Sequence, residues 1–138
     1  MRRFERLVVD ANAILSALIG GAAGRVFAGS AVGEFATTAF TRAELLPYLS
    51  VLSQKAGVSE EELRMALYLL PLTIYEQASY KRSVAEATRR VGERDPKDVD
   101  VLALALRLRA PIWSNDADLA DLGMEVLTTA KLLSAIEE

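Results

Sequence analysis

Apolar positions in this chain fall in short blocks separated by longer amphipathic segments, a pattern that predicts strands alternating with helices. The first block, Leu7–Val9, predicts a strand that ends at Asp10, and the helix expected next covers Asn12–Ile19. Four further strands are predicted at Phe35–Phe40, Leu72–Tyr75, Pro111–Ser114 and Glu125–Thr128. Because helices separate short, nearly continuous apolar strands, we expect an α/β fold with a parallel sheet covered on both faces.

Two S/T-x-x-E capping boxes mark predicted helix starts in the middle of the chain. Thr41 pairs with Glu44 in the first, and Ser59 pairs with Glu62 in the second. Pro47 is expected to kink the first of these helices or to shift its start, because proline donates no backbone hydrogen bond. The pattern thus predicts two helices between the second and third strands.

The later helices carry their own start and stop signals. Helical spacing of apolar residues ends at Gly92, and a polar segment follows. Asp95 is expected to cap the next helix and Pro96 to occupy its first position. That helix continues to Arg109 and is apolar on most sides, so we expect it to be largely buried. A short helix over Asp116–Leu122 and a C-terminal helix complete the prediction.

One segment is unusually dense in large apolar side chains. Between residues 67 and 72, four leucines and Tyr68 follow one another closely. Such density is found both in exposed interaction patches and in cores. We expect these side chains to pack in the core.

The composition limits both the architecture and the chemistry. The chain has 138 residues, 51% apolar and 25% charged, which predicts one domain over residues 1–138. It contains neither cysteine nor histidine, which excludes disulfides, thiolate or imidazole metal ligands and Ser-His-Asp catalysis. The formal net charge of −3 argues against a simple basic nucleic-acid binder. Catalysis therefore has to use carboxylates, hydroxyls, amides, lysine, arginine or tyrosine.

Hydropathy gives no sign of a membrane or secreted protein. The most apolar run, VLALAL at residues 101–106, falls far short of the roughly 18 residues that a membrane span needs. The opening segment, MRRFERLVVD, carries basic side chains but no long apolar stretch, so no secretory signal is expected. We therefore expect a cytoplasmic protein with no membrane partner.

Acidic residues recur where the predicted strands end, and open α/β sheets bind their ligands at this edge. Asp10 ends the first strand, and Asp116 follows the fourth. Glu44 and Asp98 lie in the predicted first turns of two helices. Each has a structural alternative, since carboxylates at helix starts act as capping groups. We interpret Asp95 as such a cap rather than as a ligand.

The four carboxylates taken together predict a shared site, which none of them predicts alone. Asp10 is the hardest to explain structurally, because a strand end beside apolar neighbours is a costly place for a charge. Like charges held close repel one another, and a hard divalent cation is the simplest group that keeps them ionised. Oxygen ligands suit Mg²⁺ or Mn²⁺, which activate water and neutralise phosphate charge. The residues thus predict a metal–carboxylate site for phosphate chemistry without choosing the substrate.

Three segments give the chain a resemblance to a known family. They are LVVDANAILSAL near the start, TRAELL in the middle and DVDVLALALRLRAPIWSNDADL near the end. In order and spacing they resemble the PIN-domain family of small metal-dependent ribonucleases, which includes the VapC toxins of toxin–antitoxin pairs. The last segment is the most specific, and within it Asp98 matches the family spacing to Asp116 better than Asp95 or Asp100 does.

The resemblance implies both a fold and a site. The implied fold is a three-layer α/β/α sandwich around a mostly parallel five-stranded sheet. The family's four acidic positions fall on Asp10, Glu44, Asp98 and Asp116, which implies a catalytic site that binds Mg²⁺ or Mn²⁺ and cleaves RNA phosphodiesters. The family often carries small polar or acidic supporting residues at the positions of Asn12, Ser114 and Asp118. An antitoxin that covers the site and a homodimer are also typical of the family.

Three other functions compete with this interpretation. A PIN-like scaffold that binds RNA or a protein without cutting would carry its acids as inherited or structural groups. An aspartate-nucleophile phosphatase requires two acids after the first strand, but the second position here is Asn12. A response-regulator receiver requires an aspartate in mid-chain, and residues 46–94 contain none. The scaffold is therefore the main alternative to a ribonuclease.

Overall fold

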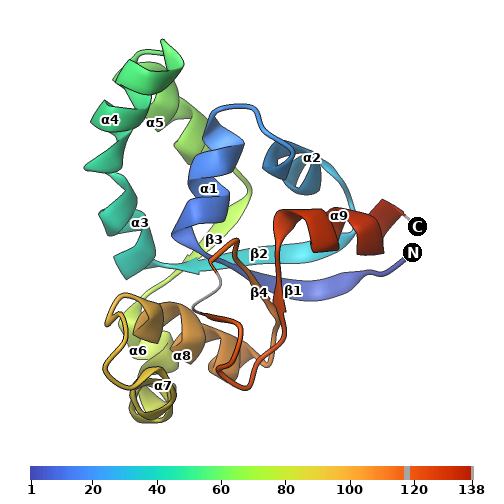
Figure 1. The fold of residues 1–138 in the computed structure, drawn as a ribbon, viewed down its shortest axis with the longest axis vertical. Helices are drawn as coiled ribbons and strands as arrows, with labels where there is room; N and C mark the ends of the chain where they lie inside the picture. Colours follow the sequence, from blue (N-terminus) through green and yellow to red (C-terminus); the bar gives the residue numbers. More distant parts are fainter. Residues whose placement is uncertain (117–118, 138) are drawn as a thin grey trace.

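The computed structural model describes residues 1–116 and 119–137, and Figure 1 shows their arrangement. Its strands are β1 (Phe4–Val9), β2 (Val32–Thr38), β3 (Leu72–Tyr75), β4 (Ile112–Trp113) and β5 (Val126–Leu127). The helices on either side of β2 are α1 (Ala11–Leu18), α2 (Ala23–Ala28), α3 (Ala39–Leu45), α4 (Tyr48–Ala56) and α5 (Glu60–Leu69). After β3 come α6 (Gln77–Tyr80), the 3₁₀ turn η1 (Lys81–Ser83), α7 (Val84–Val91), α8 (Asp98–Leu108) and α9 (Thr129–Glu137).

The five strands form one sheet in the order β3-β2-β1-β4-β5. Every neighbouring pair is parallel, and β1 lies at the centre, where Val8 is in register with Ala36 of β2 and Ile112 of β4. The predicted parallel five-stranded sheet is confirmed. Because all strands point the same way, their carboxyl ends meet at one edge, at the start of α1.

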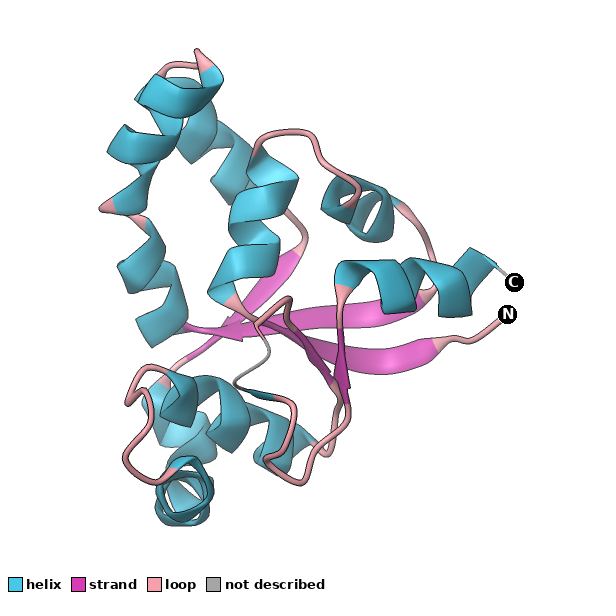
Figure 2. Cartoon of the chain, viewed as in Figure 1, coloured by secondary structure: helices cyan, strands magenta, loops and turns pink. Residues whose placement is uncertain are grey.

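Helices cover both faces of the sheet, as Figures 1 and 2 show. On one face α1, α2 and α9 pack on a core that includes Leu7, Val9 and Trp113. On the other face α7 and α8 pack on a second core that includes Val8 and Ile112. Successive residues from Leu7 to Val9 thus enter opposite cores, which is why the second half of β1 is apolar. The predicted three-layer α/β/α sandwich is confirmed.

The end of β2 and the start of α3 differ from the sequence prediction. The strand stops at Thr38, so Ala39 and Phe40 belong to the helix and not to a strand ending at Phe40. Thr38 is the N-cap, and its Oγ1 accepts a hydrogen bond from the backbone nitrogen of Thr41 at 2.8 Å. The predicted capping box of Thr41 with Glu44 is therefore wrong, because Thr41 already lies inside the helix.

Other helix boundaries follow the predicted signals more closely. Ser59 caps α5 by accepting from the backbone nitrogen of Glu62 at 3.1 Å, as predicted. Pro47 lies between Leu45, the last residue of α3, and Tyr48, the first residue of α4, so it separates the two helices. The buried helix α8 begins at Asp98, two positions after the expected Pro96, although it is buried as expected. The short helix predicted over residues 116–122 falls partly on positions outside the described residues.

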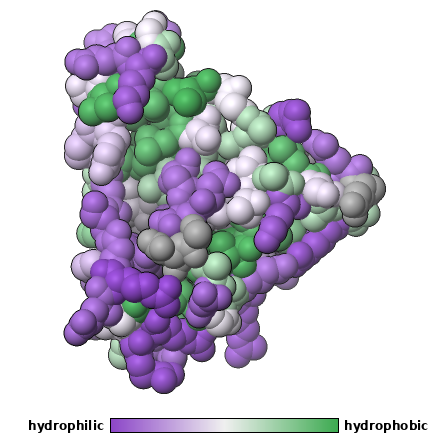
Figure 3. Space-filling view, viewed as in Figure 1, coloured by the Kyte–Doolittle hydropathy of each residue, from purple (hydrophilic) through white to green (hydrophobic). Residues whose placement is uncertain are grey.

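The leucine-rich segment at the end of α5 is only partly buried, so the expectation that it packs in the core is wrong for part of it. Leu67 is buried, but Tyr68 is 84% exposed and Leu69 is 69% exposed. Together with Met65 of α5 and Ile74 of β3, Tyr68 lines a groove of about 770 Å³. β3 is an edge strand of the sheet, so no further strand lies beyond it to cover the Tyr68 side chain. Hydrophobic side chains also gather between the α4–α5 pair and α1 (Figure 3), and neither α1 nor α4 contributes residues to the groove at Tyr68.

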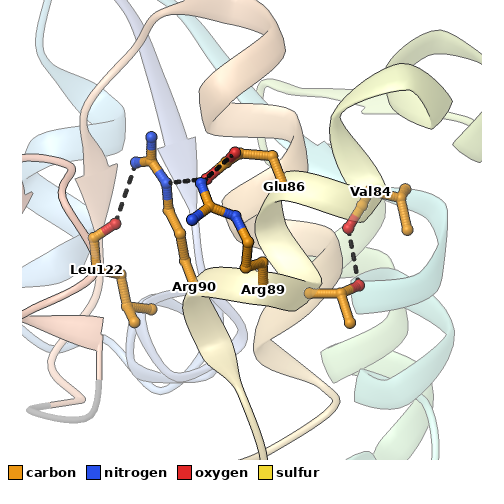
Figure 4. Close-up of polar contacts among 6 residues, drawn as sticks. Val84, Glu86, Arg89, Arg90 and Leu122 are labelled. Carbon is orange, nitrogen blue, oxygen red and sulfur yellow. Dashed lines mark hydrogen bonds and ion pairs between the residues drawn. The ribbon is translucent and has the colours of Figure 1, made fainter.

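An arginine on α7 holds the segment between β4 and β5. Arg90 donates from Nη1 to the carbonyl oxygen of Leu122 at 3.2 Å and from Nε to Glu86 at 2.8 Å (Figure 4). Gly123 follows with a φ of 82°, and a Cβ there would lie 2.9 Å from Arg90. A left-handed backbone and a covering guanidinium both favour glycine at this turn.

No helix in the described part of the chain has the length and hydropathy needed to cross a membrane.

Candidate active site

All four carboxylates predicted for the site line one pocket of about 210 Å³. Asp10 comes from the end of β1, Glu44 from α3, Asp98 from the start of α8 and Asp116 from the segment after β4. The pocket therefore lies at the carboxyl edge of the sheet, where parallel strands place the groups that follow them.

Asp10 is the best-anchored acid of the pocket. Its Oδ1 accepts from the backbone nitrogen of Ala11 at 2.9 Å, which caps α1, and its Oδ2 accepts from Ser114 Oγ at 2.8 Å. Its backbone nitrogen donates to the carbonyl oxygen of Trp113 at 3.0 Å. Two neighbouring strands thus fix both the backbone and the side chain of Asp10.

Asn12 and Ser114, the two supporting residues inside the described range, join this network. Asn12 Nδ2 lies 3.3 Å from Asp10 Oδ2, and Asn12 Oδ1 accepts from the backbone nitrogen of Asn115 at 3.0 Å. Ser114 Oγ accepts from the backbone nitrogen of Asp116 at 3.0 Å. Ser114 is 1% exposed, so its hydroxyl acts inside the protein by holding Asp10 and the backbone of Asp116 together. Asp118, the third supporting residue, lies outside the described residues.

Glu44 lies in the second turn of α3, so the expectation that it falls in the first turn of a helix is wrong. With Thr38 as the N-cap, the carboxylate of Glu44 has no part in capping its own helix. Its Oε2 lies 3.6 Å from Lys97 Nζ, across the pocket. Capping, the structural role that the sequence allowed for Glu44, is therefore excluded.

The structure distinguishes three aspartates near the start of α8. Asp98 is buried, with 7% exposure, and lines the pocket. Asp100 points elsewhere and accepts a hydrogen bond from the hydroxyl of Tyr80. Asp95 accepts from the backbone nitrogen of Lys97 at 3.0 Å, so it does hold the turn before the helix, but it also lines the pocket.

Burial and mutual repulsion act on the acids of this pocket. The pKa of Asp10 is raised because burial disfavours the charged form by more than the hydrogen bonds from Ser114 and Ala11 favour it, and Asp116 and Asp95 add smaller contributions in the same direction as burial. The pKa of Glu44 is also raised by burial and by Asp10, although Lys97 opposes this shift. Burial is thus the main cause that disfavours the charged forms of both acids.

Three residues with polar groups line the pocket but are absent from the predicted site. The capping pattern predicts Asp95 as a cap alone, and the sequence-based prediction includes neither Lys97 nor Tyr48. The capping signal of Asp95 is genuine, and a local pattern cannot show that the same turn faces a distant strand end. Proximity to Asp98 in the sequence was the one available signal for Asp95 and Lys97.

Comparison with known protein families identifies the family of this chain. The PIN-domain family matches residues 8–137. The chain belongs to the PIN-domain family. Members of this family are generally nucleases and generally use divalent metal ions.

A solved structure also supports the fold. A chain in the crystal structure of VapBC2 from Rickettsia felis bound to a DNA fragment from their promoter superposes with a TM-score of 0.64. The two chains share 13% sequence identity, and the match covers 89% of this PIN domain and 98% of that chain. Identity at this level shows a shared fold. No curated protein matches the chain in sequence.

The donor chemistry of the pocket fits a hard divalent ion. Its acids supply only oxygen ligands, and a bound cation would stabilise the charged forms of Asp10 and Glu44, which burial disfavours. Among residues 1–116 and 119–137, no three acidic side chains converge closely enough to chelate an ion directly. Mg²⁺ commonly keeps several waters and takes only one or two carboxylates, so this arrangement suits a water-rich site.

Proposed function

We propose that this PIN domain is a metal-dependent endoribonuclease that hydrolyses RNA phosphodiester bonds. Asp10, Glu44, Asp98 and Asp116 are its catalytic and metal-binding residues, with Mg²⁺ or Mn²⁺ as the cofactor. The observation that carries the proposal is the gathering of these four carboxylates in one pocket at the carboxyl edge of the sheet. Burial raises the pKa of Asp10 and Glu44 and neighbouring acids add to the shift, so it is costly to keep both groups ionised unless a cation binds them.

Each residue of the pocket has a defined task in this proposal. When bound, the ion supplies a water of lowered pKa and neutralises charge on the scissile phosphate. Asp10, held by Ser114 and by the start of α1, is the fixed ligand. Asp98 and Asp116 contribute oxygens directly or through water, and Glu44 completes the set or orients the attacking water. Asn12 and Ser114 keep Asp10 and the backbone of Asp116 in place, and Asp118 is assigned a supporting role by family resemblance.

Partners follow from the family and from the VapBC2 neighbour. We propose that the chain is the toxin of a toxin–antitoxin pair, works in the cytoplasm and forms a homodimer. An antitoxin that covers the pocket would block access of RNA. Support for this comes from a family that includes such toxins and from a fold shared with a chain of VapBC2. The alternative is a scaffold that binds RNA or protein without cutting it.

A cleavage assay with purified protein tests the proposal. Structured RNA, unstructured RNA and single-stranded DNA are incubated with Mg²⁺, with Mn²⁺ and with EDTA, beside an Asp116→Asn variant. We expect cleavage of RNA that requires a metal and disappears in the variant. Absence of cleavage together with absence of any Mn²⁺-induced rise in melting temperature would favour the scaffold. Preferential cleavage of DNA would contradict the assignment of RNA as the substrate.

A further inference from the structure

Lys97 is the one cation among the described residues that line the acidic pocket. Five carboxylates line it, those of Asp10, Glu44, Asp95, Asp98 and Asp116. Within the pocket, the ammonium of Lys97 lies 3.6 Å from Glu44 Oε2. A single positive charge thus sits among several negative ones.

The backbone around Lys97 is held in a tight turn. Its nitrogen donates to Asp95 Oδ1 at 3.0 Å, and the nitrogen of Asp98 donates to the carbonyl oxygen of Asp95 at 3.0 Å. Glu44 belongs to α3, which contacts α8. The ion pair therefore links α3 to the turn that precedes α8.

Exposure differs between the two partners of this ion pair. The Glu44 side chain is 20% exposed and the Lys97 side chain is 57% exposed. Lysine is a point charge on a flexible four-carbon stem, so its ammonium can leave Glu44 without moving the backbone. Glu44 cannot leave the pocket as easily, because α3 holds it beside the other acids.

A lysine and a divalent ion cannot share Glu44 at low cost. The ammonium of Lys97 partly neutralises Glu44 through this ion pair. A divalent ion brought to the same carboxylate meets repulsion from that ammonium at a few ångströms. The two cations are therefore competitors for one oxygen ligand.

Building on the proposed function, we infer that Lys97 is an internal counter-ion that occupies Glu44 until a divalent ion binds and then contacts a phosphate oxygen of the RNA. Lys97 thus has a role both in the metal-free pocket and in the pocket that holds the ion. It limits the repulsion among the acids of the metal-free pocket, and it offers the approaching polyanion a positive charge beside an acidic site. The displacement moves one side chain and breaks no covalent bond.

Mn²⁺ binding to the full chain, measured by calorimetry, is the first test. Lys97→Gln removes the charge and keeps most of the length, and Lys55→Gln on the exposed end of α4 is the matched control. We expect Lys97→Gln to bind Mn²⁺ roughly five- to tenfold more tightly than the wild type. Lys97→Arg and the control are expected to stay near the wild-type affinity. Unchanged or weaker binding in Lys97→Gln overturns the inference.

RNA cleavage at saturating Mn²⁺ is the second test. We expect Lys97→Gln to raise KM for RNA with little change in kcat, Lys97→Arg to restore KM, and the salt dependence of KM to weaken by about the contribution of one phosphate contact. If the wild type binds Mn²⁺ and cleaves RNA but Lys97→Gln leaves KM unchanged, this inference fails alone. A wild type that neither binds Mn²⁺ nor cleaves RNA overturns the proposed function and this inference together.

Discussion

Two groups of carboxylates on this sheet show opposite electrostatics. Glu34 on β2 accepts from the Tyr75 hydroxyl at 2.6 Å and from Arg6 Nε at 2.9 Å, and these donors lower its pKa despite partial burial. Asp10, which directly follows the neighbouring strand β1, also accepts hydrogen bonds, but burial and nearby acids raise its pKa. The donors outweigh the effect of burial at Glu34, and burial outweighs the effect of the donors at Asp10.

The contrast separates a structural acid from a candidate functional one. Glu34 contributes to the stability of the sheet because its charge is matched by a guanidinium and a phenol. The charge on Asp10 and Glu44 lowers stability in the absence of a cation, since burial in the folded state disfavours the charged forms and neighbouring acids add to this effect. We therefore expect Asp10 and Glu44 to serve function rather than stability.

The largest effect is expected from removing the charge of Asp10. Asp10→Asn keeps the size of the side chain and the cap of α1 but loses the anionic ligand, so we expect metal-dependent cleavage to fall by about a thousandfold or more. The matched control is Glu34→Gln, a carboxylate outside the pocket, for which cleavage is expected to persist. Rates with both variants at saturating Mg²⁺ provide the measurement. Equal losses of cleavage in the two variants would contradict the distinction between Asp10 as a functional acid and Glu34 as a structural one.

Stability is expected to move in opposite directions in the same two variants. Glu34→Gln weakens a charged acceptor of two donors, and we expect a loss of about 1 kcal/mol, tempered by the solvent exposure of Arg6. Asp10→Asn relieves repulsion in the pocket, so the metal-free protein is expected to melt at a higher temperature than the wild type. Thermal unfolding in EDTA at neutral pH measures both. A destabilised Asp10→Asn protein would mean that its hydrogen bonds outweigh the repulsion.

The pH dependence of stability offers a finer test. The pKa values of Asp10 and Glu44 are raised in the folded state, so between their ordinary values and the raised ones the folded protein binds more protons than the unfolded chain. Their contribution to stability therefore increases as pH falls from neutrality through this window. We expect denaturant unfolding in EDTA to show this gain relative to Asp10→Asn. Saturating Mg²⁺ should suppress it, since the ion holds both groups ionised.

The smallest effect is expected at an exposed ion pair. Arg89 and Arg90 both donate to Glu86, which lowers its pKa to about 2 (Figure 4). Its contribution is present above the ordinary pKa of a glutamate and is lost only as pH falls toward 2. Because the pair is solvent-exposed, Glu86→Gln is expected to leave the melting temperature at pH 7 within experimental error. A large drop would show that Arg90 depends on Glu86 to hold the turn at Gly123.

Much of the fold was predictable because β1 and its neighbours are buried on both faces. Apolar runs such as Leu7–Val9 have no polar face, so they indicate a parallel sheet under two helical layers. The place of Asp10 followed from the same pattern, since a charge directly after a buried strand has to lie at the carboxyl edge. These inferences depend on local sequence alone.

Other features depend on contacts between distant segments. Thr37, Thr38 and Thr41 are all plausible helix caps, and the choice of Thr38 follows from its pairing with Tyr75 of β3. Thr37 is already engaged, because its Oγ1 donates to the carbonyl oxygen of Val9. The position of Lys97 opposite Glu44 likewise arises from the packing of α3 against α8 and leaves no periodic signal in the sequence.

The sole tryptophan of the chain gives this protein an optical reporter of its own. Trp113 is fully buried, its indole nitrogen donates to Thr129 Oγ1 at 2.9 Å, and its ring lies 5.0 Å from that of Phe27. Its carbonyl oxygen accepts from the nitrogen of Asp10, and the next residue holds the Asp10 carboxylate. We therefore expect indole emission to report both the loss of the core and the binding of the proposed ion beside Asp10. Unlabelled protein in a fluorimeter would then follow folding and the proposed metal binding through the same fluorophore.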